Sequence, residues 1–167
     1  MRIGVDLGGT KILSAVLDEA GAIIASRRDD TPRDDYVATI NAIKAQVLAL
    51  ESELDRAGLT VGIGIPGSAI PSTQLIQNAN STWLNKKPLP IDIADALARP
   101  IRIENDANCF ALSEAVDGAA SGASSVFGVI LGTGVGGGLV YEALGPAFLP
   151  MASLVVLVVT TPQTALS

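Results

Sequence analysis

Hydrophobic residues alternate with polar or small residues at the start of the chain, which is the pattern of a half-buried strand. Residues 1–7 show this alternation, and shorter versions follow over residues 12–18 and 22–26. The turns at 8–9 and 18–21 separate the three runs. Consecutive short strands joined by tight turns pair as antiparallel neighbours. The first 26 residues therefore predict a three-stranded antiparallel meander.

The next pattern has the spacing of an amphipathic helix. Thr31 is suited to cap its start, and Pro32 to occupy its first helical position. Charged residues 27–35 are interpreted as a solvated face leading into this helix. Apolar side chains recur every three or four residues and form one stripe: Val37, Ile40, Ile43, Val47, Leu50 and Leu54. Gly58 is placed to end the helix.

Strand and helix patterns then alternate as far as residue 131. The β-branched run 60–65 closes with Pro66-Gly67 and predicts a buried central strand, whereas 78–90 is expected to be irregular. The remaining expected elements are a helix at 91–99, a strand at 100–103, a helix at 107–116 and a strand at 125–131. Such an order predicts an α/β protein with a mixed sheet and flanking helices.

Composition narrows the classes of function. The chain has 167 residues, 49% of them apolar, which is enough for one domain with a sizeable core. A net charge of −6 leaves no basic face for nucleic acid. Cys109 is the only cysteine, so neither a disulfide framework nor a structural zinc site is expected, and a reducing cytoplasm fits best. Cys109 itself is interpreted as a small buried hydrophobic residue.

No membrane partner is expected either. Charge and glycine interrupt the apolar stretch at the N-terminus before a signal-peptide core forms. The longest apolar run, at 154–159, is far shorter than the roughly 20 residues that a membrane-spanning helix requires.

The first candidate site is the turn Gly8-Gly9-Thr10-Lys11, which follows Asp6 at a strand end. Glycines allow backbone N–H groups to approach phosphate oxygens, and a neighbouring acid is able to hold Mg²⁺. A hairpin turn with two glycines requires no ligand, so both interpretations stay open for this segment. The segment lacks the spacing of a Walker A loop.

A second glycine-rich turn lies at residues 132–138, with five glycines in seven residues. Close approach of a ligand to the backbone is the better explanation, because a structural turn does not need so much backbone freedom. A dinucleotide site of the Rossmann type is disfavoured, since no helical pattern follows the turn.

Two further segments have both a structural and a functional interpretation. Asn105 and Asp106 lie where a strand leads into a helix, so they either cap that helix or carry chemistry, and the two roles are compatible. Trp83 is suited equally to stack on a sugar or to fill the interior of its loop.

Taken together, five segments resemble the N-terminal half of the ROK sugar kinases: 4–11, 62–67, 78–85, 104–114 and 131–138. They occur in order with family-like spacing, which makes the resemblance specific. Within the family, residues 78–85 and 31–36 look most like bacterial fructokinases of the mannofructokinase type. N-acetylglucosamine kinases and glucokinases are the nearest alternatives.

The resemblance implies an actin-like, ribonuclease-H-like ATPase fold. It also implies a reaction that uses ATP and Mg²⁺ to phosphorylate a hexose, with fructose as the favoured hexose. It assigns Asp106 as the catalytic base and Asn105, Asn80 and Gly67 as sugar-binding residues, with Asp6 near the metal. Phosphate and nucleotide contacts are implied for two groups of residues: Gly4, Val5, Asp6, Leu7, Gly8, Gly9, Thr10 and Lys11, and Gly132, Thr133, Gly134, Val135, Gly136, Gly137, Gly138 and Leu139. A homodimer is also typical of the family.

The family pattern is followed only as far as Tyr141. Beyond it, family members continue with a Glu-x-Gly-His motif, a cysteine-rich zinc motif and a second lobe, and this chain contains no histidine. We therefore expect a kinase lobe at 1–141 and a non-family apolar tail at 142–167, produced by a frameshift or premature end, and an isolated chain that is inactive. The alternatives are a non-catalytic sugar-binding regulator and an inactive remnant. Regulators of the family carry a DNA-binding helix-turn-helix before the first strand, where this chain begins on the strand.

Overall fold

The computed structural model describes residues 1–131 and 135–141. These residues form two compact units that divide between Asn105 and Asp106, and each unit is described separately. The expectations about Gly132, Thr133, Gly134 and the tail at 142–167 fall outside the described residues. The first unit contains these elements: β1 (Arg2–Leu7), β2 (Lys11–Leu17), β3 (Ile23–Asp30), α1 (Tyr36–Glu53), β4 (Thr60–Ile65), β5 (Ser68–Ala69), β6 (Ile76–Gln77), the 3₁₀ turn η1 (Thr82–Leu84), α2 (Leu89–Leu97) and β7 (Ile101–Asn105).

A five-stranded mixed sheet forms the centre of the first unit, with strand order β3-β2-β1-β4-β7. The first three strands are antiparallel neighbours, as the alternating sequence predicts, and β1, β4 and β7 are parallel. The predicted α/β fold with a three-stranded meander is confirmed. Because parallel strands end at the same edge of a sheet, the turn after β1, the loop after β4 and the last residue of β7 lie at one edge.

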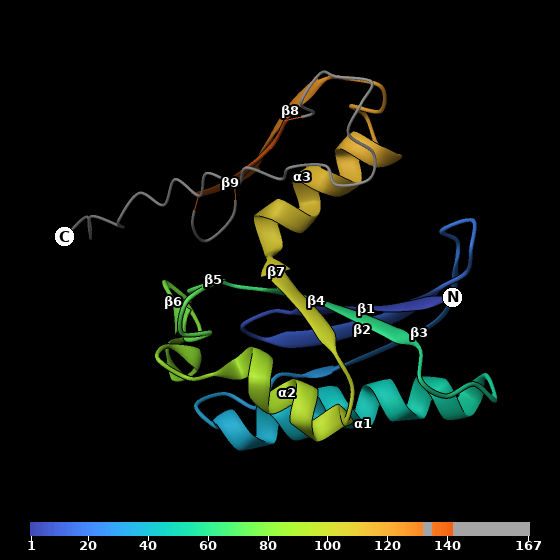
Figure 1. Cartoon of the computed structure of the whole chain (residues 1–167), viewed down its shortest axis with the longest axis vertical. Coiled ribbons are helices and arrows are strands. Elements are labelled where there is room, and N and C mark those ends of the chain that lie inside the picture. The colour runs from blue at the N-terminus through green and yellow to red at the C-terminus, as the bar shows by residue number, and fades with distance from the viewer. Residues whose placement is uncertain (132–134, 142–167) are drawn as a thin grey trace. The chain divides into compact units, whose positions relative to one another are not determined.

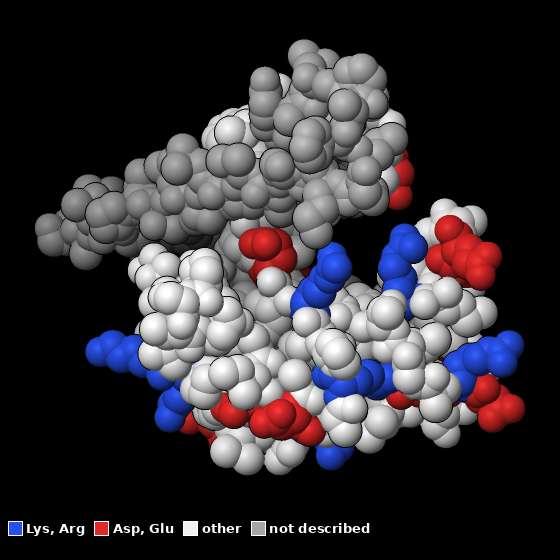
Figure 2. Space-filling view, in the orientation of Figure 1, with Lys and Arg blue, Asp and Glu red and all other residues white. Residues whose placement is uncertain are grey.

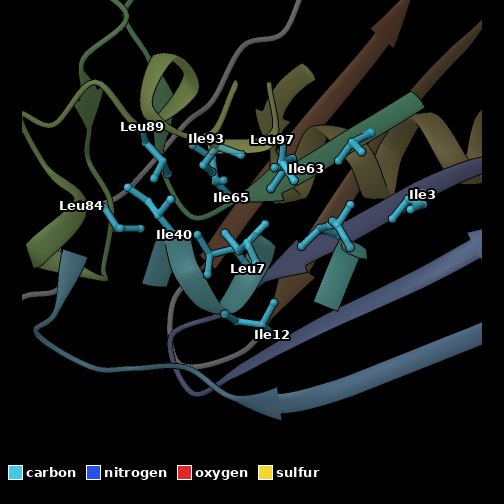
Figure 3. Close-up of a cluster of buried hydrophobic side chains, with 14 of the residues drawn as sticks. Ile3, Leu7, Ile12, Ile40, Ile63, Ile65, Leu84, Leu89, Ile93 and Leu97 are labelled. Atoms are coloured by element: carbon cyan, nitrogen blue, oxygen red, sulfur yellow. The ribbon is translucent and has the colours of Figure 1, made fainter. Parts of the chain in front are cut away.

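The core lies between this sheet and the two helices α1 and α2, which cover the same face (Figure 1). Every second residue of β1, namely Ile3, Val5 and Leu7, is at most 3% exposed. Figure 3 shows buried side chains of the strands, such as Leu7 and Ile63, close to aliphatic side chains of α1 and α2. Each fully buried aliphatic side chain contributes about 1.5–3 kcal/mol. The alternating pattern in the sequence is therefore explained by the packing of one face of the sheet on the two helices.

The start of α1 differs from the prediction. The helix begins at Tyr36, and its N-cap is Asp35, whose side chain accepts a 2.8 Å hydrogen bond from the Ala38 N–H. Thr31 and Pro32 lie before the helix. The strand β3 continues to Asp30. Asp34 adopts a left-handed backbone conformation with φ of 59°, which is incompatible with a right-handed helix, so the helix starts after it. The Thr-Pro pair that suggested a helix start therefore belongs to the connection between β3 and α1.

The end of α1 also differs from the prediction. The helix stops at Glu53, and Asp55, with φ of 50°, turns the chain away before Gly58 is reached. Along the helix the predicted stripe is buried at Ile40, Ile43, Val47 and Leu50, whereas Val37 is 64% exposed in the first turn. The charged residues that follow Ser26 are exposed, as expected, but they extend β3 along the edge of the sheet.

A buried ion pair joins α1 to the connection between α2 and β7. Arg99 donates two hydrogen bonds to Glu51, at 2.6 and 3.0 Å, and the Glu51 Oε1 also accepts from the Leu59 N–H at 2.8 Å. The side chains of Glu51 and Arg99 are only 7% and 15% exposed. Hydrogen bonding to Arg99 holds the pKa of Glu51 below its ordinary value. Removing one partner of a buried pair leaves an uncompensated charge, which destabilises proteins strongly.

We expect Glu51→Gln to lower the free energy of unfolding at neutral pH by about 3 kcal/mol. The folded-state pKa of Glu51 is depressed, so its ionised form stabilises the fold above the unfolded pKa, and this contribution is lost as the pH falls below about 4.5. The difference between wild type and variant should therefore narrow in acid. Urea unfolding at pH 7 and pH 3.5 measures it. Glu53→Gln breaks the exposed pair with Arg27 and should change stability by less than about 0.5 kcal/mol, so equal effects of the two variants would contradict the prediction.

The second unit consists of α3 (Asp106–Val116), β8 (Ser125–Leu131) and β9 (Val135–Tyr141). The strands pair as an antiparallel hairpin, with Gly128 opposite Gly138. Both glycines contact α3 closely. A Cβ on Gly138 would lie 2.5 Å from the Ala107 carbonyl oxygen, and a Cβ on Gly128 would lie 3.1 Å from the Ala111 Cβ. The helix rests on the hairpin because these two positions have no side chain.

Within the described ranges 1–131 and 135–141, the helices are too short or too polar to cross a bilayer. Positive and negative side chains are interspersed in small groups on the face shown in Figure 2.

Candidate functional site

The turn between β1 and β2 is held by bonds to its carbonyl oxygens. The Gly8 N–H donates to the Lys11 carbonyl at 2.9 Å, the Thr31 hydroxyl donates to the Gly8 carbonyl at 2.8 Å, and the Thr31 N–H donates to the Thr10 carbonyl at 3.0 Å. Neither Gly8 nor Gly9 adopts a left-handed conformation. The usual reason for a Gly-Gly hairpin, a positive φ, therefore does not explain these two glycines. Close approach explains Gly8, since a Cβ there would lie 3.0 Å from the Lys11 carbonyl oxygen.

Charged side chains flank this turn. Lys11 forms an exposed ion pair with Asp30 of β3, and hydrogen bonding to Lys11 lowers the pKa of the Asp30 carboxyl. Asp6 is exposed near the end of β1, while the side chains of Val5 and Leu7 point into the core. Within the predicted nucleotide segment 4–11, Val5 and Leu7 are therefore able to contact a ligand only through their main chain.

Gly67 begins the loop after β4 and occupies a position that only glycine fits. Its φ is 81°, and a Cβ would lie 2.4 Å from the Gln77 carbonyl oxygen and 2.7 Å from the Ala79 nitrogen. The Gly67 carbonyl accepts a 2.8 Å hydrogen bond from the Asn105 side chain. Asn105 is 5% exposed at the end of β7. Two of the predicted sugar-binding residues, Gly67 and Asn105, are therefore bonded to each other at the carboxyl edge of the sheet.

The loop that carries Asn80 is built around its own side-chain bonds. The Asn85 side chain accepts from the Ala79 N–H at 2.9 Å and donates to the Ala79 carbonyl at 3.0 Å. Asn80 itself is exposed between the buried residues Ala79 and Ser81. The loop thus holds Asn80 at the surface on a fixed backbone.

Trp83 fills the interior of this loop. Its indole N–H donates to the Thr39 hydroxyl of α1 at 3.2 Å, and its ring packs against the aliphatic core. Of the two interpretations made from the sequence, the structure favours the packing role over sugar stacking.

Ser81 joins the Asn80 loop to the glycine turn. It is 3% exposed, and a Cβ on Gly9 would lie 3.4 Å from its Oγ. The first unit therefore brings Gly8–Lys11 and the Asn80 loop side by side. Gly67 and Asn105 lie at the same sheet edge, because β1, β4 and β7 are parallel.

Asp106 starts α3 in the second unit. It is exposed, and its Oδ1 accepts a 2.8 Å hydrogen bond from the Ala107 N–H. A role at the helix start is thus visible, and it is compatible with chemistry at the same carboxylate. Cys109 is exposed as well, so the prediction of a buried cysteine is wrong. The buried face of α3 comprises Ala107, Asn108 and Ala111, and Cys109 lies outside it.

The described part of the second glycine-rich segment belongs to β9. Gly136, Gly137 and Gly138 pair with β8, and the last two are buried. Gly138 has a packing reason to be glycine, which is the contact with α3 given above. The role of this segment in phosphate or nucleotide binding stays a prediction for Val135, Gly136, Gly137, Gly138 and Leu139.

Two residues near the site were not recognised as such from the sequence. Thr31 was assigned to a helix cap, and Ser81 carried no signal beyond its place in a polar loop. The Thr31-Pro32 pair contains one sequence signal for this position. Proline disfavours a helical conformation of the residue before it, which indicates that Thr31 is extended and continues from the preceding strand.

Comparison with known proteins decides the family. The pattern of the ROK family matches residues 2–144. The chain belongs to the ROK family. Among curated relatives, N-acetyl-D-glucosamine kinase of Vibrio cholerae serotype O1 is 44% identical over 142 residues, which cover 85% of this chain and 47% of that protein. The enzyme of the same name from Pasteurella multocida is 43% identical, with 85% and 46% covered.

Solved ROK structures share the fold. The ROK hexokinase from Thermus thermophilus superposes with a TM-score of 0.73 at 32% identity, covering 84% of this chain and 46% of that one. A ROK family glucokinase from Streptomyces griseus, in complex with glucose and AMPPNP, has a TM-score of 0.71 at 33% identity, with 84% and 44% covered. This ROK chain thus has the actin-like α/β fold of sugar kinases, and it spans about half the length of the relatives it matches.

Proposed function

We propose that this ROK chain supplies the N-terminal half of an ATP-dependent kinase that phosphorylates N-acetylglucosamine. The observation that carries the proposal is the identity of 42–44% over 142 residues to N-acetyl-D-glucosamine kinases. The family match at residues 2–144 includes every proposed site residue. Fructose, the substrate favoured by the resemblance of residues 78–85, receives no support from these relatives.

The first unit provides the binding elements in this proposal. Main-chain N–H groups of the Gly8–Lys11 turn bind phosphate oxygens of ATP, as backbone donors in glycine-rich turns do. The sugar hydroxyls bind at Asn80, Asn105 and Gly67. The exposed position of Asn80, next to the turn through Ser81, supports this arrangement.

Asp6 fits the role of a Mg²⁺ ligand. Kinases hold this ion with one or two carboxylates together with substrate phosphates and water, so a complete cage of protein ligands is not required. Asp6 supplies an exposed carboxylate two residues before Gly8. The ion, when bound, would neutralise phosphate charge.

Asp106 is the proposed general base. The Ala107 N–H bonds its Oδ1 and thereby orients the carboxylate. Asp106 holds the attacking sugar hydroxyl in place and takes its proton as the oxygen bonds to the γ-phosphorus and ADP leaves. Positioning and charge neutralisation supply most of the catalysis in phosphoryl transfer, so a single oriented carboxylate is sufficient.

Binding to the 167-residue chain tests the substrate. We expect N-acetylglucosamine to shift the amide NMR signals of Gly67, Asn80 and Asn105, with a Kd about fivefold or more below that of fructose. MgATP should shift the signals of Gly8–Lys11. Glucose and mannose serve as matched sugars without the acetamido group. Tighter binding of fructose would return the substrate to the first expectation, and a chain that binds neither sugar would contradict the proposed sugar site.

A further inference from the structure

The glycine turn of the first unit presents two backbone donors to solvent. Gly9 and Thr10 are both exposed. Within residues 1–131 and 135–141, the N–H groups of Gly9 and Thr10 have no acceptor. An exposed pair of successive donors is suited to an anion. The turn has no left-handed glycine to set this orientation, so another group must hold the peptide planes.

Thr31 is the residue that contacts the carbonyl side of the turn. Its hydroxyl binds the Gly8 carbonyl and its N–H binds the Thr10 carbonyl, at 2.8 and 3.0 Å. In a trans peptide the C=O and the following N–H point in opposite directions. Holding the Gly8 carbonyl toward Thr31 therefore points the Gly9 N–H away from Thr31.

Thr31 is itself held firmly. It is 6% exposed directly after β3. The Thr39 hydroxyl of α1 lies 2.7 Å from the Asp35 carbonyl and 3.2 Å from the Pro32 carbonyl, so its one proton is shared between the two carbonyls that follow Thr31. Thr39 also accepts from the Trp83 indole N–H. The helix-cap role that would compete for the Thr31 hydroxyl belongs to Asp35.

We infer that Thr31 is a positioning residue for nucleotide phosphate binding: its hydroxyl fixes the Gly8 carbonyl so that the turn presents the Gly9 N–H to the phosphate. The inference rests on the proposed function for its ligand. Thr31 need not touch the nucleotide; it acts through the peptide between Gly8 and Gly9.

Two substitutions in the full chain test this role. Thr31→Val keeps the branched shape and removes the hydroxyl, and we expect it to raise the Kd for MgATP about tenfold. The Kd for N-acetylglucosamine should change less than twofold. Thr31→Ser keeps the hydroxyl and should bind MgATP within about twofold of wild type. Ser14→Ala, which removes another buried hydroxyl, bonded to Gln46 at 2.5 Å, is the matched control and should leave both Kd values unchanged.

Wild-type affinity for MgATP in Thr31→Val would overturn the inference, as would an equal loss for both ligands. If the valine variant does not fold, a tenfold loss in Thr31→Ser overturns it instead. A wild-type chain that binds no MgATP contradicts the proposed function and not the geometry of the turn. The geometry is then judged in the ligand-free chain, where Thr31→Val should shift the amide NMR signals of Gly9 and Thr10, while Ser14→Ala should leave them in place.

Discussion

Asp106→Asn is expected to lower sugar-dependent ADP formation by about a thousandfold. The substitution keeps the size of the side chain and an oxygen that accepts from the Ala107 N–H, but it removes the group that takes the hydroxyl proton. The assay uses a fusion of residues 1–141 to the C-terminal half of the Vibrio cholerae N-acetyl-D-glucosamine kinase, which gives the full length of that relative. The loss should fall on kcat, because the asparagine still binds the sugar hydroxyl.

The competing interpretation, a purely structural role at the helix start, makes a different prediction. It would lower the melting temperature of the fusion and leave kcat of the folded enzyme nearly unchanged. Asp117→Asn is the matched control, since it makes the same chemical change at an exposed residue just after α3. If Asp106→Asn retains more than a tenth of the turnover, Asp106 is not the base.

Parts of the fold that depend on local pattern were predictable. The alternation in β1 and the β-branched run of β4 identified two central strands, because both strands bury one regular set of side chains against the helices. The turn at Gly8–Lys11, the Pro66-Gly67 pair and Asn105 marked the ends of β1, β4 and β7. These features need only short-range information, and the sheet edge where they meet follows from the parallel pairing of β1, β4 and β7.

Other features depend on partners that are distant in sequence. Thr31 and Asp35 are both suitable caps, and the choice of Asp35 is decided by how far β3 extends and by the bond from Thr31 to Gly8, 23 residues away. Gly138 was interpreted from the sequence only as part of a ligand loop, and its close contact with Ala107 gives a packing reason for glycine that local sequence does not reveal. Cys109 was assigned to the wrong face of α3 for the same reason. A residue type limits what a position is able to do, and tertiary contacts select among those roles.

The clearest case of such a tertiary requirement is Gly67, and we expect Gly67→Ala to destabilise the chain by about 2–4 kcal/mol. The left-handed backbone at φ 81° contributes about 1 kcal/mol of this, and displacement of the Gln77 and Ala79 backbones, which a Cβ would approach to 2.4 and 2.7 Å, contributes about 1–3 kcal/mol. Because Asn105 bonds the Gly67 carbonyl, the same displacement should weaken sugar binding in any variant molecules that fold.

Gly58→Ala separates the two causes. Gly58 has a similar φ of 73°, but a Cβ there would meet no atom within 4 Å, so only the backbone strain of about 1 kcal/mol is expected. Urea unfolding of the two variants gives the comparison directly. Equal destabilisation would mean that the handedness of the backbone, and not the contact with the Asn80 loop, is what requires glycine at residue 67. A larger loss in Gly67→Ala, by about 1–3 kcal/mol, would show that the loop after β4 and the Asn80 loop are packed as one structural element, which is the arrangement that a shared sugar site needs.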